Sequence, residues 1–251
     1  MKVSMSLATF LIYCPLLMSQ ENGSSPYVDT TYSQNHQYEL IVSATSYEDG
    51  GTGPQKISLQ NANGITLWSK ASDGSGYMPI VSNRGDVAYC RGADLNIFDE
   101  KGAIKGTFIF PRRGYKPNFD ITDIYLLQSF SPDAKYYYTM LGSRDSICLL
   151  VLSDSAKELH QEFLDAFHPL QNDLQVYKDK VIVFDSHIWS DPEYKTRCCI
   201  FDKLGNLIWE YDQQAIGAAS TRWIVKFDRQ KGILKIIDGE KENIFDVNTL
   251  E

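Results

Sequence analysis

The sequence predicts an all-β protein assembled from a repeated unit of four strands. Short runs of β-branched and aromatic residues alternate with Gly, Asp, Asn and Ser along the chain. One strand–turn–strand pattern recurs at intervals, and no segment has the apolar spacing of a long amphipathic helix. These three observations indicate hairpins arranged in series rather than a helical or mixed fold.

The N-terminal residues have the organisation of an export signal. Lys2 supplies a basic start, Ser6–Met18 is an apolar run, and Ser19 is a small residue at the expected cleavage point. The run is shorter than the roughly 20 residues that span a bilayer. We therefore predict a signal peptide over residues 1–19 and an exported chain, periplasmic, cell-surface or extracellular. A retained N-terminal anchor is the alternative.

The composition narrows the classes of partner. The net charge is −8 and the isoelectric point is near 5.1, with Lys and Arg scattered along the chain. Nucleic acid binding requires clustered basic residues, so we expect no nucleic acid partner. No segment after residue 19 is apolar enough to cross a membrane. The mature chain of about 230 residues is long enough for one sizeable domain, which we expect to be monomeric.

A repeated hairpin is the most informative pattern in the sequence. In each copy an apolar strand ends at Asp, Asn or Ser, a short turn follows, usually with Gly, and a second apolar strand begins. The polar residue can accept backbone hydrogen bonds within the turn, and Gly adopts the positive φ that the turn requires. These turn-entry residues are Asn61, Asp99, Ser153, Asp202 and Asp246. Their spacings of about 38, 54, 49 and 44 residues are close to the length of a four-stranded propeller unit.

A second pair of strand-like runs precedes most of these hairpins, which gives four strands per unit. The pairs are Met78–Ser82 with Val87–Cys90, Ile124–Phe130 with Tyr136–Leu141, Leu174–Tyr177 with Val181–Phe184, and Trp223–Phe227 with Ile233–Ile237. Ser155–Phe167 comes closest to helical spacing. We predict a strand in its first half and a loop or short helical turn in its second.

Two segments resemble known repeat proteins. Ile200–Trp209, an apolar strand that ends at Asp and continues through a Gly turn to Trp, resembles the repeat of quinoprotein-like (PQQ-like) and WD40-like propellers. Ser131–Tyr136 is similar to the Ser-Pro-Asp-Gly-Lys turn of WD40-like and TolB-like propellers, although Ala134 replaces the glycine. The resemblance implies a small β-propeller of about five four-stranded blades over residues 38–251. It does not imply one function, because such propellers include enzymes, scaffolds and ligand binders.

The last copy of the repeat predicts how the ring closes. It reaches only its turn at Glu251, so its fourth strand is absent from the pattern. An unpaired edge strand favours aggregation, and we expect another segment to cover it. The N-terminal segment, residues 20–37, contains a suitable strand over Tyr27–Tyr32. We predict that this strand pairs with the last unit.

No catalytic or metal-binding pattern stands out. The four histidines are far apart, and Cys90, Cys148, Cys198 and Cys199 lie in apolar strand-like runs, where buried free thiols and disulfides both remain open. The quinoprotein resemblance implies a quinone stacked on a disulfide between adjacent cysteines. Strand alternation sends Cys198 and Cys199 to opposite faces, so we expect no cofactor. Arg84-Gly85-Asp86 matches an integrin-binding tripeptide, but a turn explains it more simply.

The longest loops give the candidate binding site. Propeller loops converge on one face, and aromatic loop residues stack on sugars or anchor protein partners. The loops are residues 46–54, 111–120 and 187–196, and the candidate residues are Tyr47, Asp49, Tyr115, His187, Trp189 and Tyr194. We expect an exported, non-enzymatic module that binds a protein or a glycan. The alternative is a secreted glycan-acting enzyme, or a quinone-dependent one, with its site in the central funnel.

Overall fold

The computed structural model describes residues 24–47, 54–72, 79–91, 93–110, 127–142, 146–165, 172–185, 196–213, 223–238 and 241–250. These residues form nineteen β-strands in five antiparallel sheets, and no helix occurs among them. Within each sheet, consecutive strands are neighbours. The all-β prediction is therefore confirmed for this part of the chain.

The first two sheets have four strands each. The first contains β1 (Ser24–Tyr32), β2 (Tyr38–Tyr47), β3 (Gln55–Asn61) and β4 (Thr66–Ser72). The second contains β5 (Ile80–Val81), β6 (Val87–Arg91), β7 (Asp94–Phe98) and β8 (Ile104–Ile109).

The third and fourth sheets repeat this order, and the fifth has three strands. The third contains β9 (Gln128–Phe130), β10 (Tyr136–Gly142), β11 (Ser146–Ser153) and β12 (Glu158–Asp165). The fourth contains β13 (Asn172–Tyr177), β14 (Lys180–Asp185), β15 (Thr196–Asp202) and β16 (Leu207–Gln213). The fifth contains β17 (Trp223–Asp228), β18 (Ile233–Asp238) and β19 (Lys241–Asp246).

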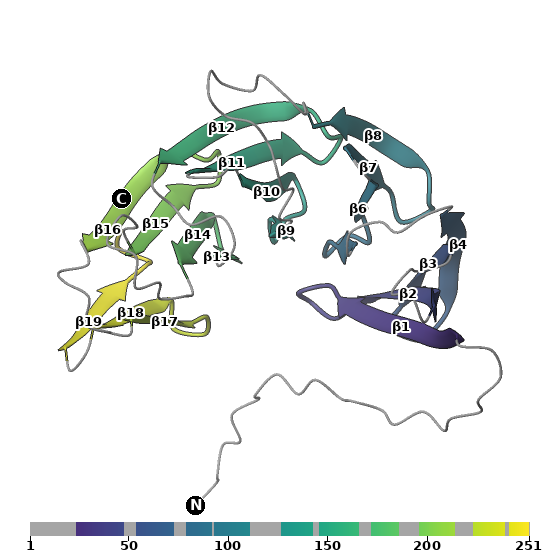
Figure 1. Ribbon diagram of the computed structural model, residues 1–251, viewed down its shortest axis with the longest axis horizontal. Helices are drawn as coiled ribbons and strands as arrows, with labels where there is room; N and C mark the ends of the chain where they lie inside the picture. The colour runs from purple at the N-terminus through teal and green to yellow at the C-terminus, as the bar shows by residue number, and fades with distance from the viewer. Residues whose placement is uncertain are drawn as a thin grey trace, which may run out of the picture.

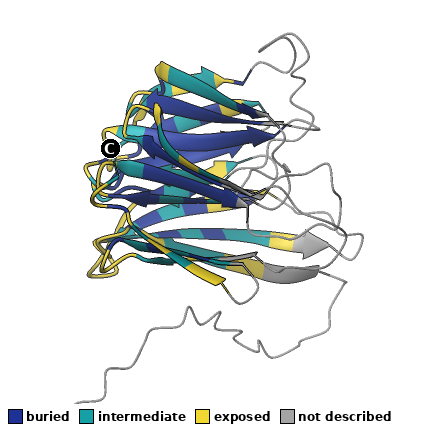
Figure 2. Cartoon of the chain, turned by 90° about the vertical axis from the view of Figure 1, so that its left-hand side faces the viewer, coloured by how far each residue is buried: buried dark blue, intermediate teal, exposed yellow. Residues whose placement is uncertain are grey.

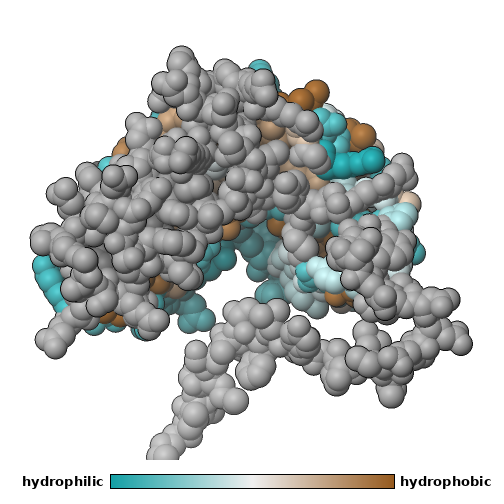
Figure 3. All heavy atoms as spheres, in the orientation of Figure 1, coloured by the Kyte–Doolittle hydropathy of each residue, from teal (hydrophilic) through white to brown (hydrophobic). Residues whose placement is uncertain are grey.

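The five sheets follow one another around an open arc (Figure 1). Successive sheets meet near the centre through their first strands, because β1 contacts β5, β5 contacts β9, and β9 contacts β13. The fourth strands lie at the outer rim, and a gap separates the first sheet from the fifth (Figure 1). Hydrophilic side chains are visible around the central hollow of the arc (Figure 3).

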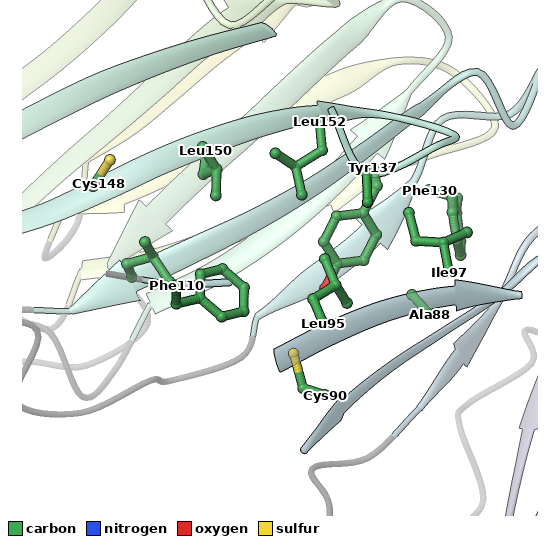
Figure 4. Packing of buried hydrophobic residues seen from close by; sticks show 12 residues of the cluster. Ala88, Cys90, Leu95, Ile97, Phe110, Phe130, Tyr137, Cys148, Leu150 and Leu152 are labelled. Carbon is green, nitrogen blue, oxygen red and sulfur yellow. The ribbon is translucent and has the colours of Figure 1, made fainter. Parts of the chain in front are cut away.

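The hydrophobic core lies between neighbouring sheets. Because side chains alternate along a strand, each central sheet contributes one apolar face to the sheet before it and one to the sheet after it. Between the second and third sheets, Tyr137 and Leu152 pack toward Leu95 and Ile97, and all four are fully buried (Figure 4). Similar clusters fill the other three interfaces. The alternating pattern in the sequence therefore becomes a series of sheet-to-sheet interfaces.

The short connections that the structure describes lie together on one side of the sheets, which we call the turn face (Figure 2). They join the first strand of each sheet to the second and, in the first four sheets, the third strand to the fourth. Asp99 Oδ1 accepts hydrogen bonds from the backbone N–H groups of Lys101 and Ala103, and Asp202 Oδ1 does the same for Leu204 and Asn206. The predicted role of the turn-entry residues is thus confirmed at these turns.

The alanine that replaces the turn glycine keeps the backbone of a glycine turn. Ala134 has φ of 55° and Ala156 has φ of 59°, in the left-handed region where Gly64 and Gly85 also lie. Both alanines are buried, and Ala156 lies in the core cluster between the second and third sheets. Both alanines therefore combine burial of the methyl group with a backbone conformation that an L-residue rarely adopts.

Two predictions about the ends of elements need correction. The strand over Tyr27–Tyr32 does not pair with the last unit, because Ser24–Tyr32 pairs antiparallel with Glu39–Tyr47 and is the first strand of the first sheet. Local hairpin pairing across a five-residue turn replaces the long-range closure that we predicted. The segment from Glu158 is a single strand to Asp165, and it includes Phe163 and Leu164, which we had assigned to a loop or helical turn.

Candidate functional site

The candidate loop residues fall almost entirely outside the described part of the chain. Tyr47 is the last residue of β2, and its backbone pairs with Ser24. The other five candidates, Asp49, Tyr115, His187, Trp189 and Tyr194, lie outside the described residues. The binding site on the long loops therefore remains a prediction, and the described geometry directs attention to the turn face.

An open cleft of about 530 Å³ lies on the turn face between the first and second sheets. Three elements form it: the start of β2, the β5–β6 turn and the β7–β8 turn. Its walls are Tyr38, Asn83, Arg84, Asp86, Asp99, Glu100 and Lys101. Each of the two turns contributes both acidic and basic side chains, so the cleft offers partners to groups of either charge.

Tyr38 connects the two sheets at one wall of this cleft. Its hydroxyl donates a hydrogen bond to Glu100 Oε2 at 3.2 Å. Burial and the nearby carboxylate of Glu100 both raise the pKa of Tyr38 above its ordinary value. The ring packs on Gly85, where an added Cβ would lie 2.8 Å from Tyr38 Cε1. Gly85 is therefore required twice, for its φ of +80° and for this close approach.

Asp86 is the most enclosed charge in the cleft. Its side chain is 6% exposed, and Lys105 Nζ lies 3.2 Å from Asp86 Oδ1 and 3.0 Å from Asp154 Oδ2. Burial raises the pKa of Asp86 and outweighs the opposing effect of Lys105. Asp86 Oδ2 has no hydrogen-bond partner among the described residues. Lys105 thus joins the second sheet to the third through two carboxylates, and this link positions the turn.

This placement decides between the two interpretations of Arg84-Gly85-Asp86. The three residues form the β5–β6 turn, as predicted. The Asp86 carboxylate is buried against Lys105, and Arg84 Nε donates to the carbonyl oxygen of Asp133 in the next sheet. An adhesion receptor needs an accessible carboxylate, so the geometry favours the structural role.

A second, smaller cavity of about 120 Å³ opens beside the cleft, at the centre of the arc. Its lining residues come from the first strands and first turns of three sheets: Thr31, Tyr32, Gln34, Ile80, Val81, Ser82, Asn83, Gln128, Ser129, Phe130 and Ser131. Eight of these eleven residues carry a hydroxyl or an amide group, and no Asp, Glu, His, Lys or Arg is among them. The cavity can donate and accept hydrogen bonds without offering charge.

The rim of this cavity is held by hydrogen bonds between successive turns. Gln34 Nε2 donates to the carbonyl oxygen of Phe130, and the backbone N–H of Asn35 donates to Asn83 Oδ1. Asn83 Nδ2 then donates to the carbonyl oxygen of Pro132. Asn83 also lines the larger cleft, so both hollows share one wall. Three sheets thus present a continuous polar surface.

The described residues contain no group of three or more His, Cys, Asp or Glu arranged to hold a metal ion. Nor does any helix among them have the length and apolarity needed to cross a membrane. Asp86 is the one described carboxyl group whose pKa is shifted upward, and it is paired with a lysine. The lining of the described site consists of hydrogen-bonding groups and paired charges.

The cysteines belong to the interior of the sheets. All four described cysteines are buried thiols. Cys198 packs in the cluster between the fourth and fifth sheets, whereas Cys199 packs in the cluster toward the third sheet. Burial raises the pKa of Cys90 to about 12 and also raises that of Cys198. The two adjacent thiols point away from each other, as strand alternation predicts.

The turn-face cleft was missed at the level of sequence. A signal for it does exist, because Ser33, Ser82 and Ser131 are spaced at equal intervals of 49 residues. Each begins the first turn of its sheet, and each hydroxyl accepts backbone hydrogen bonds there. Recognition of this second repeat would have placed β1 in the first sheet and the three turns side by side.

No protein-family model and no curated protein matches this sequence. Solved structures do resemble it in fold. Acylaminoacyl peptidase from Pyrococcus horikoshii matches with a TM-score of 0.54 at 12% identity, over 88% of this chain and 38% of the peptidase. The chain thus spans well under half the length of that enzyme.

Two further solved structures resemble this chain over most of its length, and one of them is described as a β-propeller domain. The β-propeller domain of the Trilobed protease from Pyrococcus furiosus, described as having an open velcro topology, matches with a TM-score of 0.50 at 13% identity, over 89% of this chain and 72% of that domain. The fission yeast SREBP-SCAP binding domains match with a TM-score of 0.54 at 12% identity, over 97% of this chain and 67% of that chain. The described part of the chain accordingly has a β-propeller fold of five consecutive sheets, with a WD40-like resemblance.

Proposed function

We propose that this chain is an exported β-propeller that binds a protein partner at its turn face without catalysing a reaction. The observation that carries the proposal is the polar surface formed by the 530 Å³ cleft and the adjoining 120 Å³ cavity. Both charges and neutral hydrogen-bonding groups line it, as in the polar parts of protein interfaces. Its backbone is held by hydrogen bonds between turns, so little order has to be gained on binding.

The fold supports this proposal in a general way. The fission yeast structure that resembles this chain is described as a complex of binding domains. At 12% identity this likeness concerns the fold alone. The description of that structure is compatible with a recognition role, and the site itself is argued from the cleft.

A site-specific cross-linking experiment tests the turn face. A photoreactive amino acid replaces exposed Lys101 at the cleft or, as a matched control, exposed Lys157 at the β11–β12 turn. After irradiation of producing cells, we expect a discrete protein adduct from position 101 only. Glu100→Lys should reduce its yield at least tenfold. Equal adducts at both positions, or none at position 101, would contradict a partner at the cleft.

Export is a separate part of the proposal with its own measurement. The apolar run Ser6–Met18 and the small residue Ser19 support cleavage after residue 19. We expect the N-terminal sequence of the protein recovered outside the cytoplasm to begin at Gln20. A cytoplasmic protein that retains Met1 would contradict export and leave the binding proposal to stand on the cleft.

A further inference from the structure

The fifth sheet differs from the other four at one edge. In the first four sheets the third strand is covered by a fourth: β3 by β4, β7 by β8, β11 by β12 and β15 by β16. β19 is the corresponding third strand of the fifth sheet, and it pairs only with β18 among the described residues. An edge of this kind offers backbone N–H and C=O groups to an added strand.

An apolar side chain marks this edge. The residue two positions before the turn-entry residue is fully buried in the first four sheets, as Leu59, Ile97, Val151 and Ile200. Its counterpart in β19 is Ile244, which is 58% exposed. The exposure follows from the absence of a described fourth strand and of a following sheet. Ile244 thus occupies a core position of the repeat without a core around it.

The other sheets show what lies opposite this position. The register pairs Leu59 with Trp68, Val151 with His160, and Ile200 with Trp209. Three of the four fourth strands therefore place an aromatic ring there, and the exception is Gly106 in the second sheet. An aromatic ring across from Ile244 would restore the pairing that the repeat uses elsewhere.

A charge at the other end of β19 defines the second feature of a strand that could be added at this edge. Lys241 is exposed, and its register partner on the β18 side is Asp238. Lys241 stands five positions before its turn-entry residue, as Arg197 does in β15. The register of the fourth sheet pairs Arg197 with Asp212, three residues after Trp209. An acidic residue opposite Lys241 would reproduce this arrangement.

We infer that β19 accepts an extended segment of a protein partner as its fourth strand. The segment runs antiparallel to β19 and carries an aromatic residue opposite Ile244 and an acidic residue three positions later, opposite Lys241. Main-chain hydrogen bonds supply affinity, and these two side chains supply specificity. The site lies in the fifth sheet and is separate from the cleft between the first and second sheets, so this inference goes beyond the proposed function.

A second copy of the chain fits this edge less well. Symmetric antiparallel pairing of β19 with itself must align residues that point to the same side of the sheet. Centred on Ile244, it sets Glu242 opposite Asp246, which are like charges. Centred on Asn243, it sets Lys241 opposite Phe245. Neither register gives Lys241 a carboxylate, whereas a partner segment with the stated pattern does.

A synthetic peptide with the sequence of residues 206–213, Asn-Leu-Ile-Trp-Glu-Tyr-Asp-Gln, carries the required pattern and serves as the probe. We expect fluorescently labelled peptide to bind the mature protein saturably and to protect β19 amides from hydrogen exchange. Ile244→Lys and Lys241→Glu should each weaken binding at least tenfold. Both side chains are exposed, so unchanged melting temperatures of the variants would show that the fold is intact.

Charge exchange makes the test specific. A peptide with lysine in place of its aspartate should bind Lys241→Glu at least tenfold more tightly than it binds the original protein. Lys157→Glu is the matched control at a distant exposed lysine, and Lys101→Glu alters the turn-face cleft; neither should change peptide binding. Loss of the position-101 adduct in Glu100→Lys, with peptide binding retained in the same variant, would show that the cleft and the β19 edge act separately.

Two results would overturn the inference. One is a peptide that does not bind, or binds without dependence on residues 241 and 244. The other is a concentration-dependent dimer of the protein that Ile244→Lys abolishes, because a second copy would then occupy the edge. Sedimentation of the protein without peptide measures the second outcome directly.

Discussion

Gly106 sets how closely the second and third sheets approach each other. A Cβ added there would lie 1.9 Å from the carbonyl oxygen of Ser155, a backbone atom that cannot rotate away. We expect Gly106→Ala to lower the free energy of unfolding by about 3 kcal/mol, the upper part of the range for overpacking. Gly64→Ala is the matched control, because nothing lies within 4 Å and only its φ of +74° is strained. It should cost about 1 kcal/mol in the same denaturation experiment, and equal losses would contradict the close approach.

Two of the turn-entry aspartates, Asp202 and Asp246, have a lowered pKa and give the protein part of its dependence on pH. Burial opposes ionisation of Asp202, but hydrogen bonds from the Asn206 side chain and from the backbone of Asn206 and Leu204 lower its pKa overall. A lowered pKa in the folded state contributes stability above the ordinary value of about 3.8, and this stability is lost as pH falls through the folded value. The pKa of Asp86 is raised, so ionisation of this carboxyl group lowers the free energy of unfolding as pH rises.

Asp202→Asn tests this assignment, since asparagine keeps an oxygen acceptor in the turn but cannot ionise. We expect the variant to be less stable than the original protein near neutral pH, with the difference shrinking as pH drops below about 4. Urea denaturation at a series of pH values measures it. A difference that stays constant over pH would show that the charge of Asp202 has no part in the turn.

At the scale of elements, the first sheet at the end of the arc has polar residues at positions where an interior sheet has apolar ones. Gln60 of β3 and Leu152 of β11 both directly precede a turn-entry residue, and both belong to the face toward the preceding sheet. Leu152 is fully buried against the second sheet, whereas Gln60 faces the gap and is half-buried. Ser58 lies on the same polar face as Gln60 and bonds to Ser69. The first sheet therefore lacks the apolar surface that a direct closure against the fifth would bury.

Exchange of these side chains provides a test. Leu152→Gln should lower the free energy of unfolding by about 3 kcal/mol, because it removes buried apolar contacts and leaves an amide without partners. Gln60→Leu should change it by less than about 0.5 kcal/mol, as is usual for surface substitutions. Chemical denaturation of both variants measures the contrast. A large stabilisation by Gln60→Leu would indicate that the gap face is packed in solution.

Most strands could be predicted because each is bounded by turn residues with a clear chemical role. The predictions over Val87–Cys90, Tyr136–Leu141 and Val181–Phe184 match β6, β10 and β14 to within one residue at either end. The first hairpin was assigned wrongly because its turn contains no glycine, and His36 adopts the positive φ instead. The cleft was missed because its walls come from the start of one strand and from two turns, and their proximity depends on how the first two sheets pack.

At the scale of the molecule, the stability of each sheet depends on how many neighbouring sheets it packs against. Each interior sheet packs against two others, whereas the first and fifth sheets each pack against one (Figure 1). In repeat proteins, such one-dimensional coupling lets terminal units open before interior ones. The third sheet, with its fully buried β11 core, should therefore be the last to open.

This gradient has a consequence for dynamics that hydrogen exchange can resolve. We expect amide protection in native conditions to be highest in β10 and β11 and to decrease toward β2 and β18 at the two ends of the arc. Uniform protection across all five sheets would mean that the molecule unfolds as one cooperative block. With the expected gradient, local opening begins at the sheets beside the gap. A segment added at β19 would then reduce the opening of the fifth sheet and leave the first sheet as the more dynamic end of the arc.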